Sequence, residues 1–216
     1  MLKRGIASIV IWLAVLSSVC WASCDQFYPL GKVVTKQTAI ELCNASYVVV
    51  FDPAVNGAIF SAEKYRPNVQ VKRSNAFHSD PRVANGPKVA NYLNSGYDKG
   101  HLTPAEDATT VTEEFDTFLI TNMTPQAKLL NEASWRMLET TVRNLNPDYI
   151  LTGAIYPAVP NYIKGTHVPI PASYYKLVWV HGSIYGWYAD NLDTAKVVAI
   201  DIKEVESMSG LSFPRY

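Results

Sequence analysis

Residues 96–105 read GYDKGHLTPA and hold the most informative grouping of side chains in the chain. They place an acid, a cation and an imidazole within four positions, at Asp98, Lys99 and His101, and Gly100 lets the backbone turn sharply between them. Imidazole titrates at a pKa of about 6.5 and can exchange protons at neutral pH. Because a lone histidine in a loop is usually just solvated, His101 indicates a site only if other polar groups join it.

A second group of polar residues follows. Residues 122–126 read NMTPQ, and Asn131 and Glu139 come after them. Carboxamide and carboxylate oxygens are the hard ligands that magnesium prefers, and magnesium keeps most of its waters and takes only one or two protein ligands. These residues are therefore candidates for a sparse magnesium site. The four histidines of the chain form no HExxH or HxxxH pair, which argues against a zinc site built from neighbouring histidines.

Asn131 and Glu139 also have structural explanations. Asn is a preferred N-cap and the predicted helix begins at Asn131, while Glu139 and Arg143 have the i to i+4 spacing of an ordinary helical ion pair. On a helix, Asn131 and Glu139 are separated by about 12 Å of rise. Side chains that far apart cannot easily bind one ion directly, so if they share a metal, one of them acts through a water molecule.

The rest of the chain shows a mixture of helix and strand patterns. Residues 131–145 form the clearest helix, with apolar side chains at three-and-four spacing and Pro147 beyond its end. Runs rich in β-branched and aromatic residues predict strands at residues 47–51, 58–65, 115–120, 149–156, 174–180, 183–188 and 196–202. Few helices and several hairpins predict an α+β fold, with a central, largely antiparallel sheet flanked by helices.

Two segments in the first half have more specific patterns. Asn56 and Gly57 separate the first two predicted strands, and Asn-Gly is the favoured dipeptide of a type I′ hairpin turn. Residues 64–87 are polar and rich in basic side chains, which predicts a long surface segment with local positive charge. Long ordered loops are often functional, so this segment is a candidate part of a site.

The composition fits one globular domain. The chain has 216 residues, of which 48% are hydrophobic and 18% are charged, so it can bury a core and is neither disordered nor a coiled coil. Its 19 Lys and Arg residues balance 19 Asp and Glu residues, so it lacks the basic excess usual in obligate nucleic-acid-binding proteins. A basic rim around one site is still compatible with this balance. The basic residues before His101 include Lys64, Arg66, Lys72, Arg73 and Lys99.

Residues 1–23 have the pattern of a secretory signal peptide. Lys3 and Arg4 form a basic start, an apolar run follows, and small residues precede a cleavage point near Ser23. We expect cleavage to leave a single domain of residues 24–216 that is secreted or periplasmic and has no stable membrane association. Two alternatives stay open: an uncleaved membrane anchor, since the apolar run approaches the length that spans a bilayer, and, less well supported, a lipoprotein attached at Cys24.

Cleavage would remove Cys20 and leave Cys24 and Cys43 as a pair. In an exported and oxidising compartment such a pair forms a disulfide, which here would tie the new N-terminus to the region of Cys43. In a reducing compartment the two residues would remain free thiols. The CxxC spacing of a zinc site is absent.

Residues 98–105, DKGHLTPA, closely resemble the Asp-Arg-Gly-His signature of the DNA/RNA non-specific endonucleases, a family of ββα-metal nucleases. Residues 122–126 resemble the Asn-x-x-Pro-Gln segment of this family, and residues 130–139 resemble its Leu-Asn, Trp and Leu-Glu helix at the same spacing. Arg73 resembles the upstream phosphate-binding arginine, and residues 204–214 are similar to the closing strand and turn. The resemblance covers most of residues 24–216 and implies the ββα-metal fold.

The resemblance also implies a role for each site residue. His101 would be the general base, and Asn131 would hold a divalent ion, magnesium, with manganese as a substitute. Glu139 would orient water around the ion, and Asn122 would fix His101 or the metal site. The residues implied in phosphate binding are Arg73, Lys99 and Arg143.

Lys99 departs from the family pattern, in which an arginine is usual. Lysine keeps the positive charge but lacks the planar fork that binds phosphate in two places. We therefore expect a weaker and less directional phosphate contact, with the class of reaction unchanged.

Together these features predict a metal-dependent, sequence-nonspecific endonuclease that hydrolyses DNA and RNA and leaves 5′-phosphate ends, since contacts limited to phosphate carry no sequence information. The neutral charge and Lys99 leave open an alternative, a catalytically weak or inactive secreted binding domain on the same fold. A phosphodiesterase acting on small nucleotides is a third interpretation. Preference for DNA or RNA, the oligomeric state and the existence of a protein inhibitor are left open.

Overall fold

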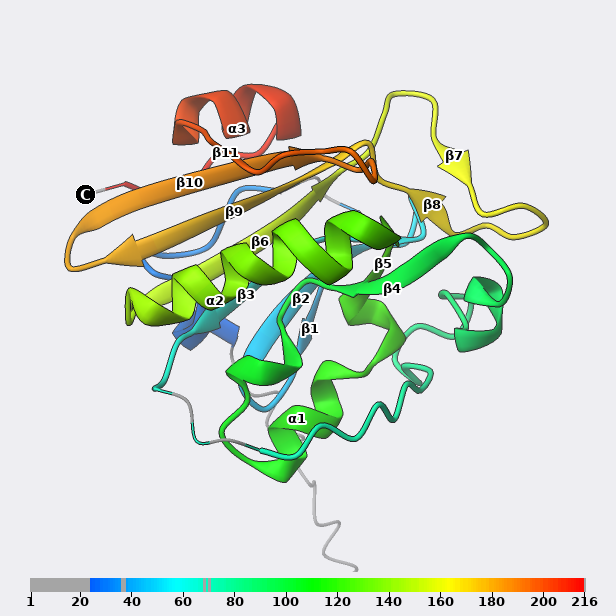
Figure 1. The fold of residues 1–216 in the computed structure, drawn as a ribbon, viewed down its shortest axis with the longest axis horizontal. Coiled ribbons are helices and arrows are strands. Elements are labelled where there is room, and N and C mark those ends of the chain that lie inside the picture. The colour runs from blue at the N-terminus through cyan, green and yellow to red at the C-terminus, as the bar shows by residue number, and fades with distance from the viewer. Residues whose placement is uncertain (1–23, 36–37, 68, 70, 216) are drawn as a thin grey trace, which may run out of the picture.

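The chain folds around one large antiparallel sheet (Figure 1). The computed structural model describes residues 24–35, 38–67, 69 and 71–215, so the predicted signal peptide lies outside the described residues. Within these ranges the sheet has seven strands in the order β1-β2-β3-β6-β9-β10-β11, and each is antiparallel to its neighbours. The predicted α+β fold with a largely antiparallel sheet is confirmed.

The strands of the large sheet are β1 (Ile40–Cys43), β2 (Tyr47–Asp52), β3 (Gly57–Lys64), β6 (Tyr149–Ile155), β9 (Ser173–Val180), β10 (Ser183–Asp190) and β11 (Val198–Ala199). Two small antiparallel pairs accompany it: β4 (Tyr97–His101) with β5 (Met123–Ala127), and β7 (Asn161–Tyr162) with β8 (Pro169–Ile170). The helices are α1 (Val111–Thr117), α2 (Arg136–Asn144) and α3 (Ile202–Ser209), and a π-helical segment, Leu130–Trp135, leads directly into α2. Short 3₁₀ turns occur at Cys24–Phe27, Val89–Tyr92, Ala105–Asp107 and Ile120–Asn122.

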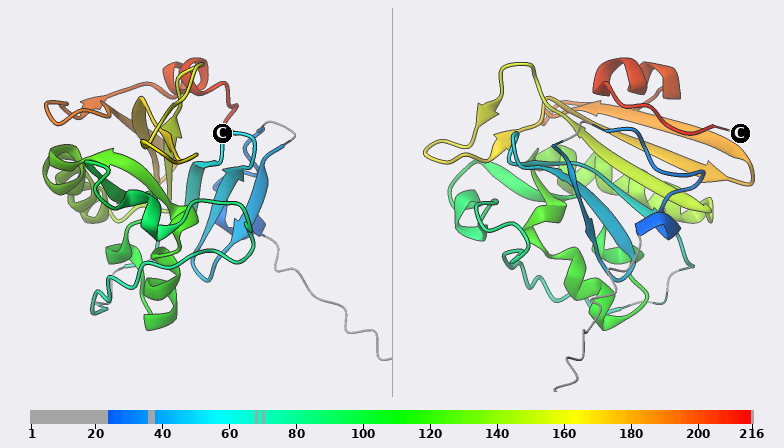
Figure 2. Two further views of the ribbon diagram at one scale, coloured as in Figure 1. Left: turned by 90° about the vertical axis from the view of Figure 1, so that its right-hand side faces the viewer. Right: turned by 180° about the vertical axis from the view of Figure 1, so that it is seen from behind.

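The two faces of the sheet are covered by different elements, and Figure 2 shows α2 and α3 on opposite sides of it. Leu138 and Val142 of α2 pack on one face, in a cluster with Val178 of β9. Val205 of α3 packs on the other face, in a cluster with Leu177. Each face therefore buries its own hydrophobic core.

The first hairpin forms between β2 and β3 as expected, but its turn differs from the prediction. Gly57 is the first residue of β3 and pairs with Asp52, so the turn comprises residues 53–56, in which Asn56 has a φ of 60°. A type I′ turn centred on Asn56 and Gly57 requires positive φ at both residues, and that prediction was wrong. Gly57 serves close packing instead, because a Cβ there would lie 2.6 Å from the hydroxyl oxygen of Tyr156.

Residues 115–120 do not form the expected strand. Most of them belong to α1 and to the 3₁₀ turn that follows. Thr110 caps α1 by accepting a hydrogen bond from the backbone N–H of Glu113 at 3.2 Å, and Glu113 and Glu114 lie in the first turn, where negative charge stabilises a helix. These local signals outweigh the apolar character of the segment, so the strand prediction was wrong.

The predicted helix over residues 131–145 exists, but it begins before Asn131. Leu129 already has helical dihedral angles, with φ −71° and ψ −30°. Asn131 therefore lies inside the helix, in its π-helical segment, and the interpretation of Asn131 as an N-cap was wrong. The residue is free for another role.

The C-terminal region is more helical than expected. The predicted strand at residues 196–202 shortens to β11, and α3 follows it. Asp201 caps α3 by accepting from the backbone N–H of Lys203 at 2.8 Å, and Gly210 ends it with a φ of 68°. The expectation of a closing strand and turn over residues 204–214 was therefore wrong.

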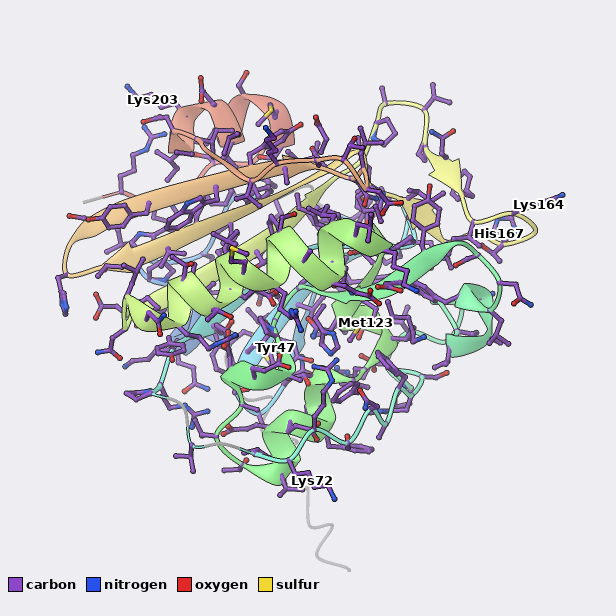
Figure 3. The ribbon with its side chains drawn as sticks, viewed as in Figure 1. Tyr47, Lys72, Met123, Lys164, His167 and Lys203 are labelled. Atoms are coloured by element: carbon purple, nitrogen blue, oxygen red, sulfur yellow. A yellow bond between two sulfur atoms is a disulfide. The ribbon has the colours of Figure 1, made fainter. Side chains whose placement is uncertain are left out.

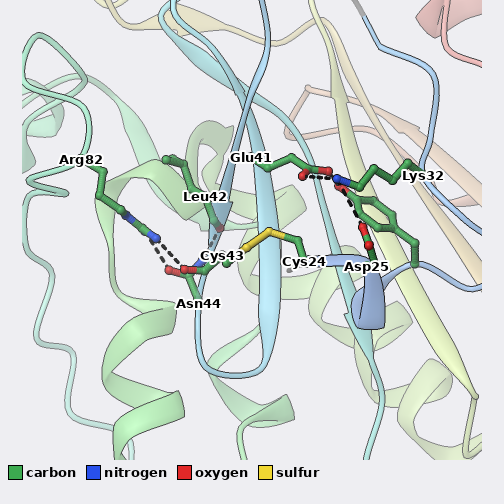
Figure 4. Close-up of a disulfide and its surroundings, with 9 residues drawn as sticks. Cys24, Asp25, Lys32, Glu41, Leu42, Cys43, Asn44 and Arg82 are labelled. Atoms are coloured by element: carbon green, nitrogen blue, oxygen red, sulfur yellow. Dashed lines mark hydrogen bonds and ion pairs between the residues drawn. A yellow bond between two sulfur atoms is a disulfide. The ribbon is translucent and has the colours of Figure 1, made fainter. Parts of the chain in front are cut away.

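Cys24 and Cys43 form the predicted disulfide, with their Cα atoms 5.5 Å apart (Figure 4). The bridge ties the first 3₁₀ turn to the end of β1. Lys32 strengthens the same region through ion pairs with Asp25 at 3.3 Å and Glu41 at 2.7 Å. In the part of the chain that the structure describes, no helix combines the length and apolar character needed to cross a membrane.

Candidate active site

The motif residues converge on a cavity of about 500 Å³. Most of them come from a ββα unit, in which β4 pairs with β5 and the π-helical segment and α2 follow β5, with α1 inserted between the two strands. The cavity is lined by Arg73, Lys99, His101, Pro104, Glu106, Asn131, Glu132, Arg136 and Glu139. Of the residues singled out in the sequence, the structure brings five together here and leaves Asn122 and Arg143 outside the lining.

His101 is the last residue of β4 and pairs with Met123 of β5. Met123 lies near the middle of the molecule in Figure 3. The imidazole of His101 packs edge-on against Phe118, with ring centroids 5.0 Å apart, and also contacts Phe77. Nε2 is buried and makes no hydrogen bond, so Nδ1 is the ring nitrogen left to meet the cavity. The aromatic packing thereby fixes the orientation of the base.

The surroundings of His101 keep it uncharged. Burial lowers the pKa of His101 to about 3, and the positive charges of Arg73 and Lys99 act in the same direction. The neutral imidazole has a lone pair that can accept a proton. At neutral pH the residue is therefore in the state that a general base needs.

Gly100 is required by packing and not by a turn. It lies within β4 opposite Thr124, and a Cβ at this position would overlap the side chain of Gln126. The expectation of a sharp turn at Gly100 was wrong, because the segment is a strand. The missing side chain instead lets β5 lie close behind His101.

Asn131 faces the cavity in a fixed orientation. Its Nδ2 donates a hydrogen bond to Oδ2 of Asp98 at 2.9 Å, and Asp98 lies on β4, close to His101 in sequence. Because the amide nitrogen is used in this way, Oδ1 is left as the atom that can bind a cation. Asp98 therefore links the motif of β4 to the helix.

Glu139 lies in α2, beyond Asn131 along the same helix, and is partly exposed to the cavity. Burial, together with the negative charges of Asp107 and Glu106, raises the pKa of its carboxyl to about 7, whereas Lys176 and Arg143 oppose the rise. A carboxyl with a pKa in this range is easily switched between its two charge states by a bound cation or substrate. Such perturbed groups in cavities are typical of functional sites.

The donor atoms fit a hard divalent ion. In the ranges that the structure describes, no group of three or more His, Cys, Asp or Glu side chains is arranged to hold a metal. Asn131 and Glu139 nevertheless present amide and carboxylate oxygens to one cavity, which suits an ion that keeps most of its water and takes one or two protein ligands. The sparse site expected from the sequence is compatible with this geometry.

The cations of the cavity are held by aromatic rings and polar partners. The guanidinium carbon of Arg73 lies 5.1 Å from the ring centre of Phe118, and Nζ of Lys99 lies 4.6 Å from that of Phe77. Cation–π contacts of this kind fix charges without neutralising them. Lys99 can therefore present positive charge to an anion in the cavity, whereas Arg73 is also paired with the carboxylate of Glu106 at 2.9 Å.

Asn122 is fully buried and supports His101 from behind. Its Oδ1 accepts from the backbone N–H of Thr103 at 3.0 Å, and its Nδ2 donates to the carbonyls of Thr103 and Thr117 at 2.9 Å. These bonds fasten the segment after His101 to the end of α1. Asn122 therefore holds the segment after His101 in place and does not line the cavity itself.

Arg143 lies outside the lining of the cavity. It donates to Oδ1 of Asp107 at 3.1 Å and to the hydroxyl of Thr140. The spacing suggested an ion pair between Arg143 and Glu139, but Arg143 pairs with Asp107 instead. With its guanidinium engaged there, the expected phosphate contact of Arg143 finds no support. Arg136, one helical turn before Glu139, lines the cavity and could have been found from its i to i+3 spacing.

A group of buried charges lies beneath the cavity. Lys176 of β9 is 1% exposed and donates to Thr152, and its Nζ lies 5.7 Å from the ring centre of Trp135 in the π-helical segment. Glu63 of β3 is 4% exposed. Burial lowers the pKa of Lys176 and raises that of Glu63. In the sequence, this buried group could have been suspected from Lys176, a lysine within an otherwise apolar strand pattern.

Comparison with known proteins gives the class. A family model described as DNA/RNA non-specific endonuclease matches residues 28–215. Mitochondrial endonuclease G of Bos taurus is 28% identical over 200 residues, which are 78% of this chain and 67% of the relative. Nuclease C1 of Cunninghamella echinulata var. echinulata is 28% identical over 202 residues, covering 78% of this chain and 80% of the relative.

A similar fold occurs in a crystal structure of the EndoG/EndoGI complex that describes the mechanism of EndoG inhibition. The TM-score is 0.67 at 22% sequence identity, and the match covers 80% of this chain and 84% of the other. The chain therefore has the ββα-metal fold. The chain belongs to the DNA/RNA non-specific endonuclease family, as the resemblance of its motifs predicted, and it is a nuclease that hydrolyses phosphodiester bonds.

Proposed function

We propose that this nuclease cuts DNA and RNA without sequence preference, with magnesium as its ion and manganese as a substitute. The observation that carries the proposal is one cavity in which an uncharged imidazole, His101, faces Asn131 and Glu139 between fixed cations. Contacts to phosphate alone carry no sequence information, which supports cleavage independent of sequence.

The side chains divide the work of phosphodiester hydrolysis. Arg73 and Lys99 bind the phosphate, and its negative charge offsets theirs, so the pKa of His101 rises toward its ordinary value when substrate is bound. Nδ1 of His101 then takes a proton from the water that attacks phosphorus. The P–O3′ bond breaks and the leaving 3′ oxygen takes up a proton from solvent water, which leaves a 5′-phosphate and a 3′-hydroxyl.

Asn131 would hold the divalent ion through Oδ1, and Glu139 would orient water beside it. When bound, the ion neutralises charge that develops on the phosphate and on the leaving 3′ oxygen. Asp98 keeps the Asn131 amide turned toward the cavity, and Asn122 holds the strand that carries His101. These two residues position the site without touching the substrate.

Export is part of the proposal. The disulfide between Cys24 and Cys43 supports a secreted or periplasmic location, because such bridges persist in oxidising compartments. By analogy with the EndoG/EndoGI complex, a protein inhibitor is a further partner to test.

The test is cleavage of supercoiled plasmid by purified protein with magnesium or manganese. Loss of a general base typically costs about 10²- to 10⁴-fold in rate, so we expect His101→Ala to lose activity on this scale while its unfolding transition is retained. His167→Ala is the matched control, since His167 lies at the edge of the molecule (Figure 3) and we expect it to cut normally. Plasmid that stays intact with both ions, or a His101→Ala protein that cuts as well as the parent, contradicts the proposal and favours a binding domain.

A further inference from the structure

An ion pair occupies the cationic wall of the cavity. Nη1 of Arg73 lies 2.9 Å from Oε1 of Glu106, and the two side chains are 41% and 48% exposed. Both residues line the cavity that contains His101. A carboxylate therefore already binds the guanidinium that is proposed to bind phosphate.

Arg73 does not depend on Glu106 alone for its position. Its Nε donates to Oδ1 of Asn75 at 2.8 Å, and its guanidinium lies over the ring of Phe118. These contacts leave Nη1, the atom that Glu106 engages, as a donor toward the cavity. Glu106 can be displaced without releasing Arg73 from the wall.

Glu106 is itself presented from a fixed element. It belongs to the 3₁₀ turn Ala105–Asp107, and its neighbour Asp107 is buried and paired with Arg143 at 3.1 Å. The chain cannot easily move Glu106 away from Arg73, although the exposed side chain can rotate. An anion that enters the cavity must therefore compete with a carboxylate that is always nearby.

On the basis of the proposed function, we infer that Glu106 occupies the phosphate-binding donor of Arg73 when no substrate is present, and that a phosphodiester must displace it to bind. Carboxylate and phosphate oxygens accept hydrogen bonds from the same guanidinium donors. Glu106 is thus a residue that sets substrate affinity by competition, and it keeps affinity for nucleic acid low.

The charge of the cavity is consistent with this role. Three cations line it, Arg73, Lys99 and Arg136, together with three carboxylates, Glu106, Glu132 and Glu139. The ion pair of Arg73 is made with Glu106 and not with Glu132. Glu132→Gln therefore removes the same formal charge from the same cavity without touching Arg73, which makes it the matched control.

The test measures binding in the absence of cleavage. A fluorescein-labelled single-stranded thymidine oligonucleotide is titrated with protein in EDTA at low salt, and the Kd is read from fluorescence anisotropy. Exposed ion pairs are weak, so we expect Glu106→Gln to lower the Kd about two- to fivefold. Glu132→Gln should change it by less than Glu106→Gln does.

A double-mutant cycle with Arg73→Ala separates competition from net charge. In the Arg73→Ala background, Glu106→Gln should lower the Kd by no more than Glu132→Gln does. The inference is overturned if Glu106→Gln binds no tighter than the parent, as it would if Glu106 merely positioned Arg73, or if its gain persists without Arg73. Because no cutting is measured, these outcomes are distinct from a failure of the proposed nuclease activity in the plasmid assay.

Discussion

Both faces of the central sheet bury hydrophobic side chains, but only one of them also buries charged groups beneath its helix. The face beneath α2 carries Glu63, Thr152 and Lys176, all of them buried. The face beneath α3 is aromatic and aliphatic at the same strands, with Phe60, Leu151, Tyr175, Leu177 and Trp179. Since successive side chains of a strand point to opposite faces, a single strand, β9, contributes to both.

The difference shows which part of the molecule supplies stability and which part supports the site. Burying charge costs free energy unless the charges are paired, so the face beneath α3 is the better stabiliser. The charges of the other face lie under the helix that carries Glu139, and they act on its carboxyl. Lys176 and Leu177 are neighbours in sequence on opposite faces, and they offer a matched pair of tests.

Replacing Lys176 with Met should have the largest effect. The change leaves Glu63, Asp107 and Glu139 without their buried cation, and removal of one partner from a buried charged group typically costs about 3–5 kcal/mol. The cost should be greatest at pH 8 and should shrink toward pH 5, where the carboxyls take up protons. Urea unfolding at both pH values measures this, and a cost that is equal at both would contradict an electrostatic role for Lys176.

Leu177→Ala should cost about 2–5 kcal/mol of unfolding free energy, because it leaves a cavity in an apolar core. The neighbours of Leu177 in its hydrophobic cluster are apolar and aromatic side chains, so the cost should be the same at pH 5 and pH 8. Plasmid cleavage by the folded protein should stay close to that of the parent. Strong loss of cleavage in a protein that remains folded would show that the two faces are not separable.

Glu139→Gln should have the smallest effect on stability, and it should raise the free energy of unfolding instead of lowering it. The pKa of Glu139 is about 7 in the folded protein, against an ordinary value of 4.5 for a glutamate carboxyl. Between pH 4.5 and about pH 7 the folded state therefore keeps a proton that the unfolded state has lost. The protein loses stability as the pH rises through this range. Above pH 7 the neutral variant should be more stable than the parent by about 1–2 kcal/mol, an amount reduced from the full shift because the side chain is partly exposed.

At pH 4.5 the Glu139→Gln variant and the parent should unfold alike. The measurement is made in EDTA, since a bound cation would favour the carboxylate. The same variant should cleave plasmid more slowly than the parent. A variant less stable than the parent at pH 8 would mean that the ionised carboxylate is stabilised by its surroundings, against the direction of the pKa shift.

The sequence predicts the fold class and most of the strands, because alternation and β-branched runs are local signals. It fails where local capping decides the outcome. Thr110 caps a helix that runs into the predicted strand at residues 115–120, and Asp201 caps one that begins at the end of the predicted strand at residues 196–202. Capping residues act through a single hydrogen bond, which a pattern of hydrophobic residues does not reveal.

The site was predictable to the extent that its residues lie in the motifs. The structure brings His101, Asn131, Glu139, Lys99 and Arg73 to one cavity. Glu106 and Lys176 could not be found from spacing, because their partners are distant in sequence and their roles depend on burial and pairing. The phosphate role of Arg143 came from the family resemblance, which could not reveal that its guanidinium pairs with Asp107, 36 residues earlier in the sequence.

The π-helical segment Leu130–Trp135 has a consequence for how this family can diverge. Widened turns of this kind interrupt regular helices and are frequent at functional sites. Deletion of one residue upstream of Glu139 within this segment would rotate Asn131 by about 100° around the helix axis relative to Glu139. A variant could then keep every motif residue and still lose the site, so the site depends on the number of residues between Asn131 and Glu139 as much as on their identities.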